Sequence, residues 1–268
     1  MSESYDTIRL ERDGPVARVV LARPDIRNAF NEVMIRELRE VFGALRRQAD
    51  VRVVVLTGEG KAFCAGADVH WMRKMVGYSF DENLEDALGL AHLMREIYDF
   101  PRPVVGRVNG AAIGGGTGLV AVTDIAIAAE SAVFSFSEVK IGLVPACISP
   151  FVLKRVGERH GREYFLTGER LGAARALECG LVNTVVPDAE LDGEVDRYVD
   201  MLLTGGPEAQ ATAKRMVRDV VEQSLEEAGP YTAEVIARLR IADEGQEGMT
   251  AFLERRKPGW WIERAGSS

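Results

Sequence analysis

Residues 51–68 have the sequence VRVVVLTGEGKAFCAGAD, in which a run of apolar, mostly β-branched residues is followed by a cluster of small residues. The apolar run predicts a short buried strand, because strands covered on both faces are continuously apolar. The small residues that follow predict a tight connection into a helix. The same order returns in residues 104–116, VVGRVNGAAIGGG, so the chain repeats a strand and a small-residue cluster.

The segments on either side of these two repeats extend the pattern. Residues 5–12 and 16–21 predict a β-hairpin around Asp13-Gly14-Pro15, and the apolar residues after Asn31 recur at helical spacing. A second helix is expected before Pro101, strands at 124–129 and 132–136, and helices from Ser149 onward. Because strands and helices alternate, the fold class is predicted to be α/β.

The strand signal disappears beyond Pro187. Helical stretches are predicted at 190–203, 207–227 and 231–241, separated by Gly205-Gly206 and Gly229-Pro230. We therefore expect a main α/β domain over residues 1–200 and a C-terminal helical region over residues 201–268.

Composition excludes several classes of protein. A hydrophobic content of 47% over 268 residues is sufficient for a packed core, and no apolar stretch approaches the ~20 residues that cross a membrane. The N-terminal residues lack the basic start and apolar run of a secretory signal, so a cytoplasmic location is expected. A net charge of −8 argues against nucleic-acid binding. Three cysteines without a Cys-x-x-Cys pair, and three histidines without metal-ligand spacing, predict neither disulfides nor a metal.

The two small-residue clusters have a possible chemical use. Small residues let a ligand approach the main chain, and the first turn of a helix has N–H groups without acceptors in the helix. Two such donors can hold one oxyanion, each contributing about 3 kcal/mol to a transition state. Either cluster alone is also compatible with a tight connection that binds nothing. Residues 116–121, GTGLVA, fit G-x-G-x-x-A, but dinucleotide binding leaves the hairpin and the other cluster unexplained.

Several ordered motifs resemble the crotonase (enoyl-CoA hydratase/isomerase) superfamily over nearly the whole chain. They are AFCAGAD at 62–68, NGAAIGGG at 109–116, FSFSE at 134–138 with GLVP at 142–145, RP at 23–24 with NA at 28–29, and EGMTAF at 247–252 with RRK at 255–257. The resemblance implies a spiral of repeated strand-strand-helix units with a C-terminal helical oligomerisation region. It also implies an acyl-CoA substrate, assembly as a homotrimer or a dimer of trimers, and no membrane or nucleic-acid partner.

The resemblance also implies roles for individual residues. The N–H groups of Ala67 and Gly115 would bind the thioester oxygen, and Glu138 would act on the acyl carbons as acid and base. Substrate-binding positions carried over in the same way are Arg27, Ala65, Gly66, Asp68, Gly114, Gly118 and Arg255. Asp68 begins a predicted helix, which favours a structural role. No separate cofactor is expected, since coenzyme A is part of the substrate.

Gly118 departs from the superfamily pattern. Hydratases commonly have a second glutamate three residues after the oxyanion glycine, and here that position is Gly118. We expect the missing side chain to leave a small gap beside Glu138. A single carboxylate suits double-bond isomerisation, so an isomerase is the alternative to a hydratase. A non-catalytic CoA-binding or RNA-binding member is a further alternative, against which Glu138 and the paired clusters argue.

A finer resemblance favours the hydratase. The segments ADVHWM at 67–72, NLEDA at 83–87, SEVKIG at 137–142 and ISPF at 148–151 look like those of bacterial 3-methylglutaconyl-CoA hydratases, which act in leucine degradation. The resemblance therefore suggests a hydro-lyase acting on a branched, carboxylated enoyl-CoA.

Overall fold

The computed structural model describes residues 5–264, so residues 1–4 of the first predicted domain and 265–268 of the second lie outside it. The chain divides into two compact units. Residues 5–100 and 104–195 form the first unit, and residues 101–103 and 196–264 form the second. The predicted boundary after residue 200 falls inside the helix α7 (Leu191–Leu203), close to the start of the second unit.

A large sheet forms the base of the first unit. Its strands are β1 (Ile8–Asp13), β2 (Val16–Leu21), β3 (Val53–Gly58), β5 (Val104–Val108), β7 (Ile125–Ala129) and β10 (Thr184–Val186), hydrogen-bonded in that order. The predicted hairpin is present, because β1 and β2 are antiparallel, and every later pair is parallel. All six residues of β3 are buried, as its continuous apolar sequence predicts.

A second, smaller sheet contains β4 (Ala62–Cys64), β6 (Ala111–Ile113), β8 (Val133–Ser135) and β9 (Arg170–Gly172). Each of β3, β5 and β7 in the large sheet is followed directly by β4, β6 or β8 in the small one. Helices then follow each pair: α2 (Val69–Met75) with α3 (Phe80–Tyr98), α4 (Gly115–Val122), and α5 (Ser149–Thr167). The predicted α/β class with repeated strand-strand-helix units is therefore confirmed.

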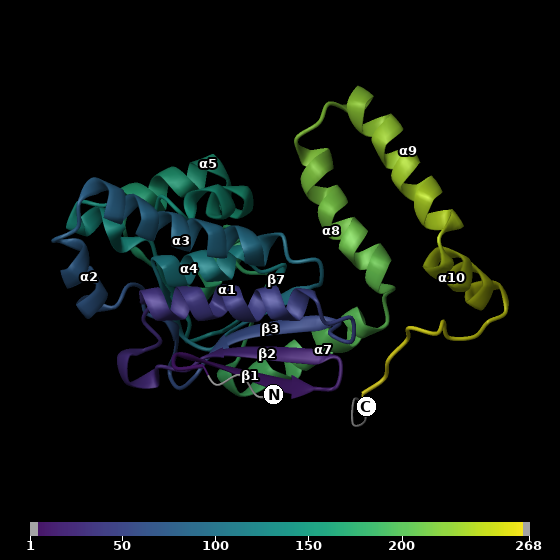
Figure 1. Cartoon of the computed structure of the whole chain (residues 1–268), viewed down its shortest axis with the longest axis horizontal. Coiled ribbons are helices and arrows are strands. Elements are labelled where there is room, and N and C mark those ends of the chain that lie inside the picture. Colours follow the sequence, from purple (N-terminus) through teal and green to yellow (C-terminus); the bar gives the residue numbers. More distant parts are fainter. Residues whose placement is uncertain (1–4, 265–268) are drawn as a thin grey trace. The chain divides into compact units, whose positions relative to one another are not determined.

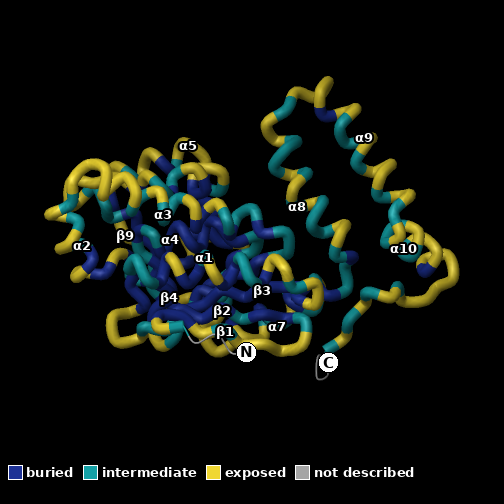
Figure 2. Tube along the Cα trace, viewed as in Figure 1, coloured by how far each residue is buried: buried dark blue, intermediate teal, exposed yellow. Residues whose placement is uncertain are grey.

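Helix α1 (Glu32–Arg46) lies beside α3 in Figure 1 and buries an apolar face that includes Met34, Leu38 and Phe42. Asn31 caps α1, since its side chain accepts a hydrogen bond of 2.9 Å from the Met34 N–H. Shorter elements complete the unit: η1 (Pro24–Ile26), η2 (Ser137–Ile141), α6 (Ala173–Glu178) and η3 (Asp188–Glu190). Figure 2 shows the strands as the most deeply buried part of this unit.

The second unit contains α8 (Pro207–Val221), α9 (Leu225–Ile241) and α10 (Asp243–Leu253). The predicted break at Gly229-Pro230 is wrong, because α9 runs through Pro230. The break lies earlier, where Ser224 and Glu227 form a capping box: the Glu227 N–H donates to Ser224 Oγ at 3.3 Å and the Ser224 N–H to Glu227 Oε2 at 3.0 Å. This cap starts α9 five residues ahead of the proline, and the helix continues through it.

No helix within residues 5–264 is long and apolar enough to cross a membrane.

Candidate active site

Three neighbouring strands of the small sheet bring the sequence motifs together. β4 pairs in parallel with β6, and β6 pairs in parallel with β8. Parallel strands end at the same edge of a sheet, so the residues after each strand converge there. These residues are the segments 65–68, 114–116 and 136–138, which carry the predicted site. In the register, Ile113 at the end of β6 lies opposite Ser135 at the end of β8.

The segment after β4 presents one backbone donor. Phe30 donates its N–H to the Gly66 carbonyl at 2.7 Å and accepts the Asp68 N–H at 2.7 Å, as in a parallel β-bridge. The intervening Ala67 N–H therefore points away from Phe30, and it has no hydrogen-bond acceptor within residues 5–264. Gly66 has φ of 93°, a conformation that favours glycine and turns the chain at this point. Ala67 is an exposed residue.

The segment after β6 presents a second donor. The Gly114 N–H bonds to the Ser135 carbonyl at 2.8 Å, and α4 begins at Gly115. The Gly115 N–H belongs to the first helical turn and has no acceptor among the described residues. A Cβ built on Gly66 would lie 3.2 Å from the Ile113 carbonyl oxygen, which shows that the two donor segments are adjacent.

Glu138 lies at the same edge, within η2. A Cβ built on Gly114 would lie 2.9 Å from Glu138 Oε1, so the carboxyl group packs directly against the residue before the Gly115 donor. Glu138 Oε2 is buried and has no hydrogen-bond partner in the part of the chain that the structure describes. Burial raises the pKa of this carboxyl group, against a smaller opposite effect of its own backbone N–H. The result is a carboxylate held ready to accept a proton.

Asp68 has a structural position beside this edge. One carboxylate oxygen accepts the His70 N–H at 2.7 Å and so caps α2, and the other pairs with Arg23 Nη2 at 2.7 Å. Burial opposes ionisation of Asp68, but the Arg23 pair and the His70 hydrogen bond outweigh it and lower the pKa of Asp68. The ion pair and cap support the structural role expected from its place at the helix start.

The residues around Arg23 hold the first donor segment in place. The buried Asn28 accepts the Arg23 N–H at 2.9 Å and donates to the carbonyls of Glu59 at 2.9 Å and Ala62 at 2.8 Å. The motif NA at 28–29 includes this asparagine, but the sequence predicted no role for it. Phe30, which aligns the Ala67 segment, was missed, because a bridge between residues distant in sequence leaves no local pattern.

The other predicted contacts lie in two places. Ala65 donates its N–H to the Arg27 carbonyl at 2.9 Å, so Arg27 adjoins the first donor segment, and its side chain is exposed. Arg255 belongs to the second unit, where it is also exposed and follows α10.

The gap expected at Gly118 is not present. Gly118 is buried, and a Cβ built on it would lie 2.8 Å from Ile148 Cβ, still closer to Ile148 Cγ2, and 3.4 Å from Met94 Cε. Ile148 therefore fills the volume that a side chain at position 118 would need. The expectation failed because Ile148 comes from a different helix start, thirty residues along the chain, and nothing in the sequence signals that contact.

Neither a reactive thiol nor a metal-binding cluster accompanies the site among the described residues. Burial raises the pKa of the Cys64 thiol to about 12, which leaves it in the unreactive protonated form. Within residues 5–264 no group of three His, Cys, Asp or Glu side chains is placed to hold a metal ion.

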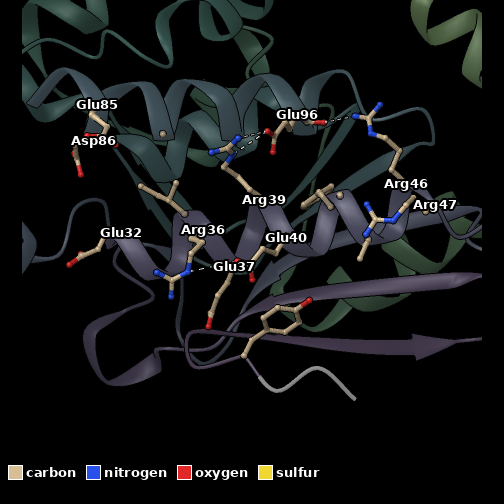
Figure 3. Close-up of a pocket in the computed structure, with 16 residues that line it drawn as sticks. Glu32, Arg36, Glu37, Arg39, Glu40, Arg46, Arg47, Glu85, Asp86 and Glu96 are labelled. Carbon is tan, nitrogen blue, oxygen red and sulfur yellow. Dashed lines mark hydrogen bonds and ion pairs between the residues drawn. The ribbon is translucent and has the colours of Figure 1, made fainter. Parts of the chain in front are cut away.

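A separate groove of about 1210 Å³ lies over α1 and α3 and is shown in Figure 3. Arg39 and Glu96 face each other in it, with Nη2 and Oε1 2.8 Å apart. None of the predicted site residues is among the described residues that line it.

Comparison with known proteins identifies close relatives over almost the whole chain. The family model described as enoyl-CoA hydratase/isomerase matches residues 11–262. The crystal structure of an enoyl-CoA hydratase from Shewanella pealeana has 41% sequence identity and a TM-score of 0.94, and the match covers 97% of each chain. Pseudomonas aeruginosa AtuE has 34% identity and a TM-score of 0.92, over 96% of this chain and 100% of that one. An enoyl-CoA hydratase from Mycobacterium smegmatis has 33% identity and a TM-score of 0.90, with the same coverage.

The buried carboxyl group gives a prediction about stability and pH. Since the pKa of Glu138 is raised by folding, its contribution to stability is complete below the ordinary pKa of glutamate and is lost as pH rises through the folded pKa. Glu138→Gln removes the buried charge, so its Tm should exceed that of the wild type near pH 7 and the difference should vanish at acid pH. Scanning calorimetry from pH 4 to 8 tests this, with the exposed Glu130→Gln as control. A Glu138→Gln difference that does not depend on pH would contradict it.

Proposed function

Because the chain belongs to the enoyl-CoA hydratase/isomerase family, we propose that it hydrates a 2-enoyl-CoA thioester with Glu138 as the acid and base. The observation that carries the proposal is the meeting of three groups at one sheet edge: a buried, unpartnered Glu138 oxygen and the N–H groups of Ala67 and Gly115, which have no acceptors in the described chain. Together they match the needs of a reaction that passes through an enolate.

The two N–H groups would bind the thioester oxygen and stabilise the negative charge that develops on it. In the ionised form, Glu138 accepts a proton from water while the water oxygen bonds to C3 of the enoyl group. The resulting enolate then takes this proton from Glu138 at C2. One O–H bond and the C2=C3 π bond break, a C3–O and a C2–H bond form, and the carboxylate is regenerated. Burial of Glu138 supports both steps, because a raised pKa strengthens the base and lets it hold the proton in between.

Double-bond isomerisation is the second candidate. It is favoured by the packing at Gly118, where Ile148 stands in place of a second carboxylate. Glu138 alone can remove a proton from C2 of a 3-enoyl thioester, giving a dienolate, and return it at C4 as the double bond moves to C2–C3, which needs no water.

The acyl group that we propose is 3-methylglutaconyl, which would place the enzyme in leucine degradation. This rests on the resemblance of residues 67–72, 83–87, 137–142 and 148–151 to hydratases of that substrate. Arg27, whose side chain is exposed beside the Ala65 segment, and Arg255 are proposed to contact the phosphates of coenzyme A. No cofactor beyond the CoA of the substrate is proposed, and the enzyme is proposed to work in the cytoplasm.

Turnover in labelled water tests the reaction type. Purified protein is offered crotonyl-CoA, a 3-enoyl-CoA and 3-methylglutaconyl-CoA in H₂¹⁸O, and products are identified by mass. A hydratase must incorporate the label, whereas movement of the double bond without label identifies an isomerase. Glu138→Gln should lower turnover by roughly 100-fold to 10,000-fold, the usual contribution of a general acid and base. Wild-type rates in Glu138→Gln would remove Glu138 from the mechanism.

A matched pair of variants tests the Gly115 donor. Gly115→Pro deletes the N–H at the first position of α4, where proline is compatible with the helix. Gly115→Ala keeps the N–H and adds the same Cβ, which would lie 3.1 Å from the Phe30 ring. We expect kcat of Gly115→Pro to be about 100-fold to 1000-fold below that of Gly115→Ala. Equal kcat values would mean that this N–H does not bind the oxyanion.

Assembly into trimers, or dimers of trimers, is proposed through the second unit. Figure 2 shows its helices with large exposed stretches, and apolar side chains on them are mostly exposed: Val221 by 77%, Leu225 by 93% and Phe252 by 83%. Such exposure is costly for a protein that stays alone in water. Sedimentation equilibrium at micromolar concentration should give the mass of three or six chains. A stable monomer would contradict the assembly.

A further inference from the structure

Position 118 lies one helical turn after the residue against which the proposed acid and base packs. Gly118 donates its N–H to the Gly114 carbonyl at 3.1 Å, so it lies one turn after Gly114 on the same face of α4. Gly114 is the residue against which Glu138 Oε1 packs. Because Cα–Cβ bonds in a helix tilt toward its N-terminus, a Cβ at 118 would point toward the Gly114 turn, where the Glu138 carboxyl group packs. Whatever fills this volume therefore lies about one helical turn from that carboxyl group.

Ile148 fills it, and it cannot easily withdraw. Its side chain is only 2% exposed, and both its Cβ and Cγ2 lie too close to tolerate a Cβ on Gly118. Rotation about χ1 moves Cγ2 but leaves Cβ where it is. The backbone is also fixed, since the Ser149 N–H bonds to the Pro145 carbonyl at 3.0 Å and the Val152 N–H to the Ile148 carbonyl at 3.1 Å. A large residue at 148 therefore requires glycine at 118.

We propose that Ile148 is a specificity-determining residue, which supplies the apolar wall beside Glu138 and limits the size of the branch that an acyl chain carries near the reacting carbons. Met94, whose Cε lies 3.4 Å from the position of a Cβ on Gly118, backs the same wall. The substrate class that fits is a 2-enoyl thioester with a small hydrocarbon branch. Because Ile148 occupies the volume, α4 cannot place a charged side chain at position 118. The inference rests on the proposed function.

Thermal unfolding without substrate tests whether the side chains at positions 118 and 148 compete for the same volume. Gly118→Ala is measured in the wild type and in Ile148→Ala and Ile148→Gly backgrounds. In the wild type it should lower Tm by about 5 °C, a typical effect of overpacking a chain of this size. The loss should shrink with Ile148→Ala and shrink further with Ile148→Gly, which also removes Cβ. The same loss in all three backgrounds, or no loss in the wild type, would overturn the pairing of the two positions.

Whether Ile148 limits the size of the acyl branch is tested by measuring kcat/KM for crotonyl-CoA and for a 2-enoyl-CoA with a propyl branch at C3. Ile148→Ala should raise the ratio of branched to unbranched kcat/KM about tenfold, since one or two methylene groups in an apolar pocket have effects of this order. Val156→Ala is the control, because it removes buried hydrocarbon from the same helix two turns farther on. Its ratio should equal that of the wild type.

The outcomes separate the two proposals. Wild-type turnover with an unchanged ratio in Ile148→Ala, or the same rise in Val156→Ala, overturns the role of Ile148 and leaves the proposed function standing. No wild-type turnover of any enoyl-CoA overturns the proposed function and, with it, the selectivity of Ile148.

Discussion

Parallel pairing of β4, β6 and β8 is the interaction on which the site depends. It places the carboxyl ends of three short strands at one edge, although each strand comes from a different strand-strand-helix unit. The Ala67 donor, the Gly115 donor and Glu138 then follow these strands within a few residues. A shift in the register of β6 would move Gly114 and Gly115 away from both neighbours. The large sheet and its helices set the spacing of the units and so protect this register.

The edge that results leaves polar groups without partners. Two backbone N–H groups and a buried carboxylate oxygen of Glu138 lack partners within the described residues, although folded chains normally satisfy such groups. The buried Glu138 oxygen costs stability in the absence of ligand, and each of the three groups matches one need of the proposed enolate-forming reaction. Neighbouring polar side chains do have partners: Asn28 forms hydrogen bonds with three backbone groups. Asp68 pairs with Arg23 and caps the N-terminus of α2. The three groups without partners thus lie together at the edge where we propose that a thioester binds.

The sequence predicts local features better than contacts between distant segments. The buried strand β3, the hairpin and the glycine-opened helix α4 follow from periodicity and turn residues, and Glu138 follows from its motif. The break at Gly229-Pro230 was wrong, because α9 starts at the Ser224 capping box and runs through Pro230. The open gap at Gly118 was wrong because tertiary packing decides what fills a glycine's empty volume, and Ile148 carries no local sign of that role.

We have proposed that two backbone N–H groups, those of Ala67 and Gly115, polarise the thioester carbonyl of the substrate. Infrared difference spectroscopy of a ¹³C-labelled thioester carbonyl, free and bound to the inactive Glu138→Gln protein, measures this polarisation in the bound ligand itself. Hydrogen bonding to both donors weakens the C=O bond, so the carbonyl band should lie at clearly lower frequency in the complex than in water. A carbonyl band that stays at its frequency in water would show that the two N–H groups do not polarise the bound thioester.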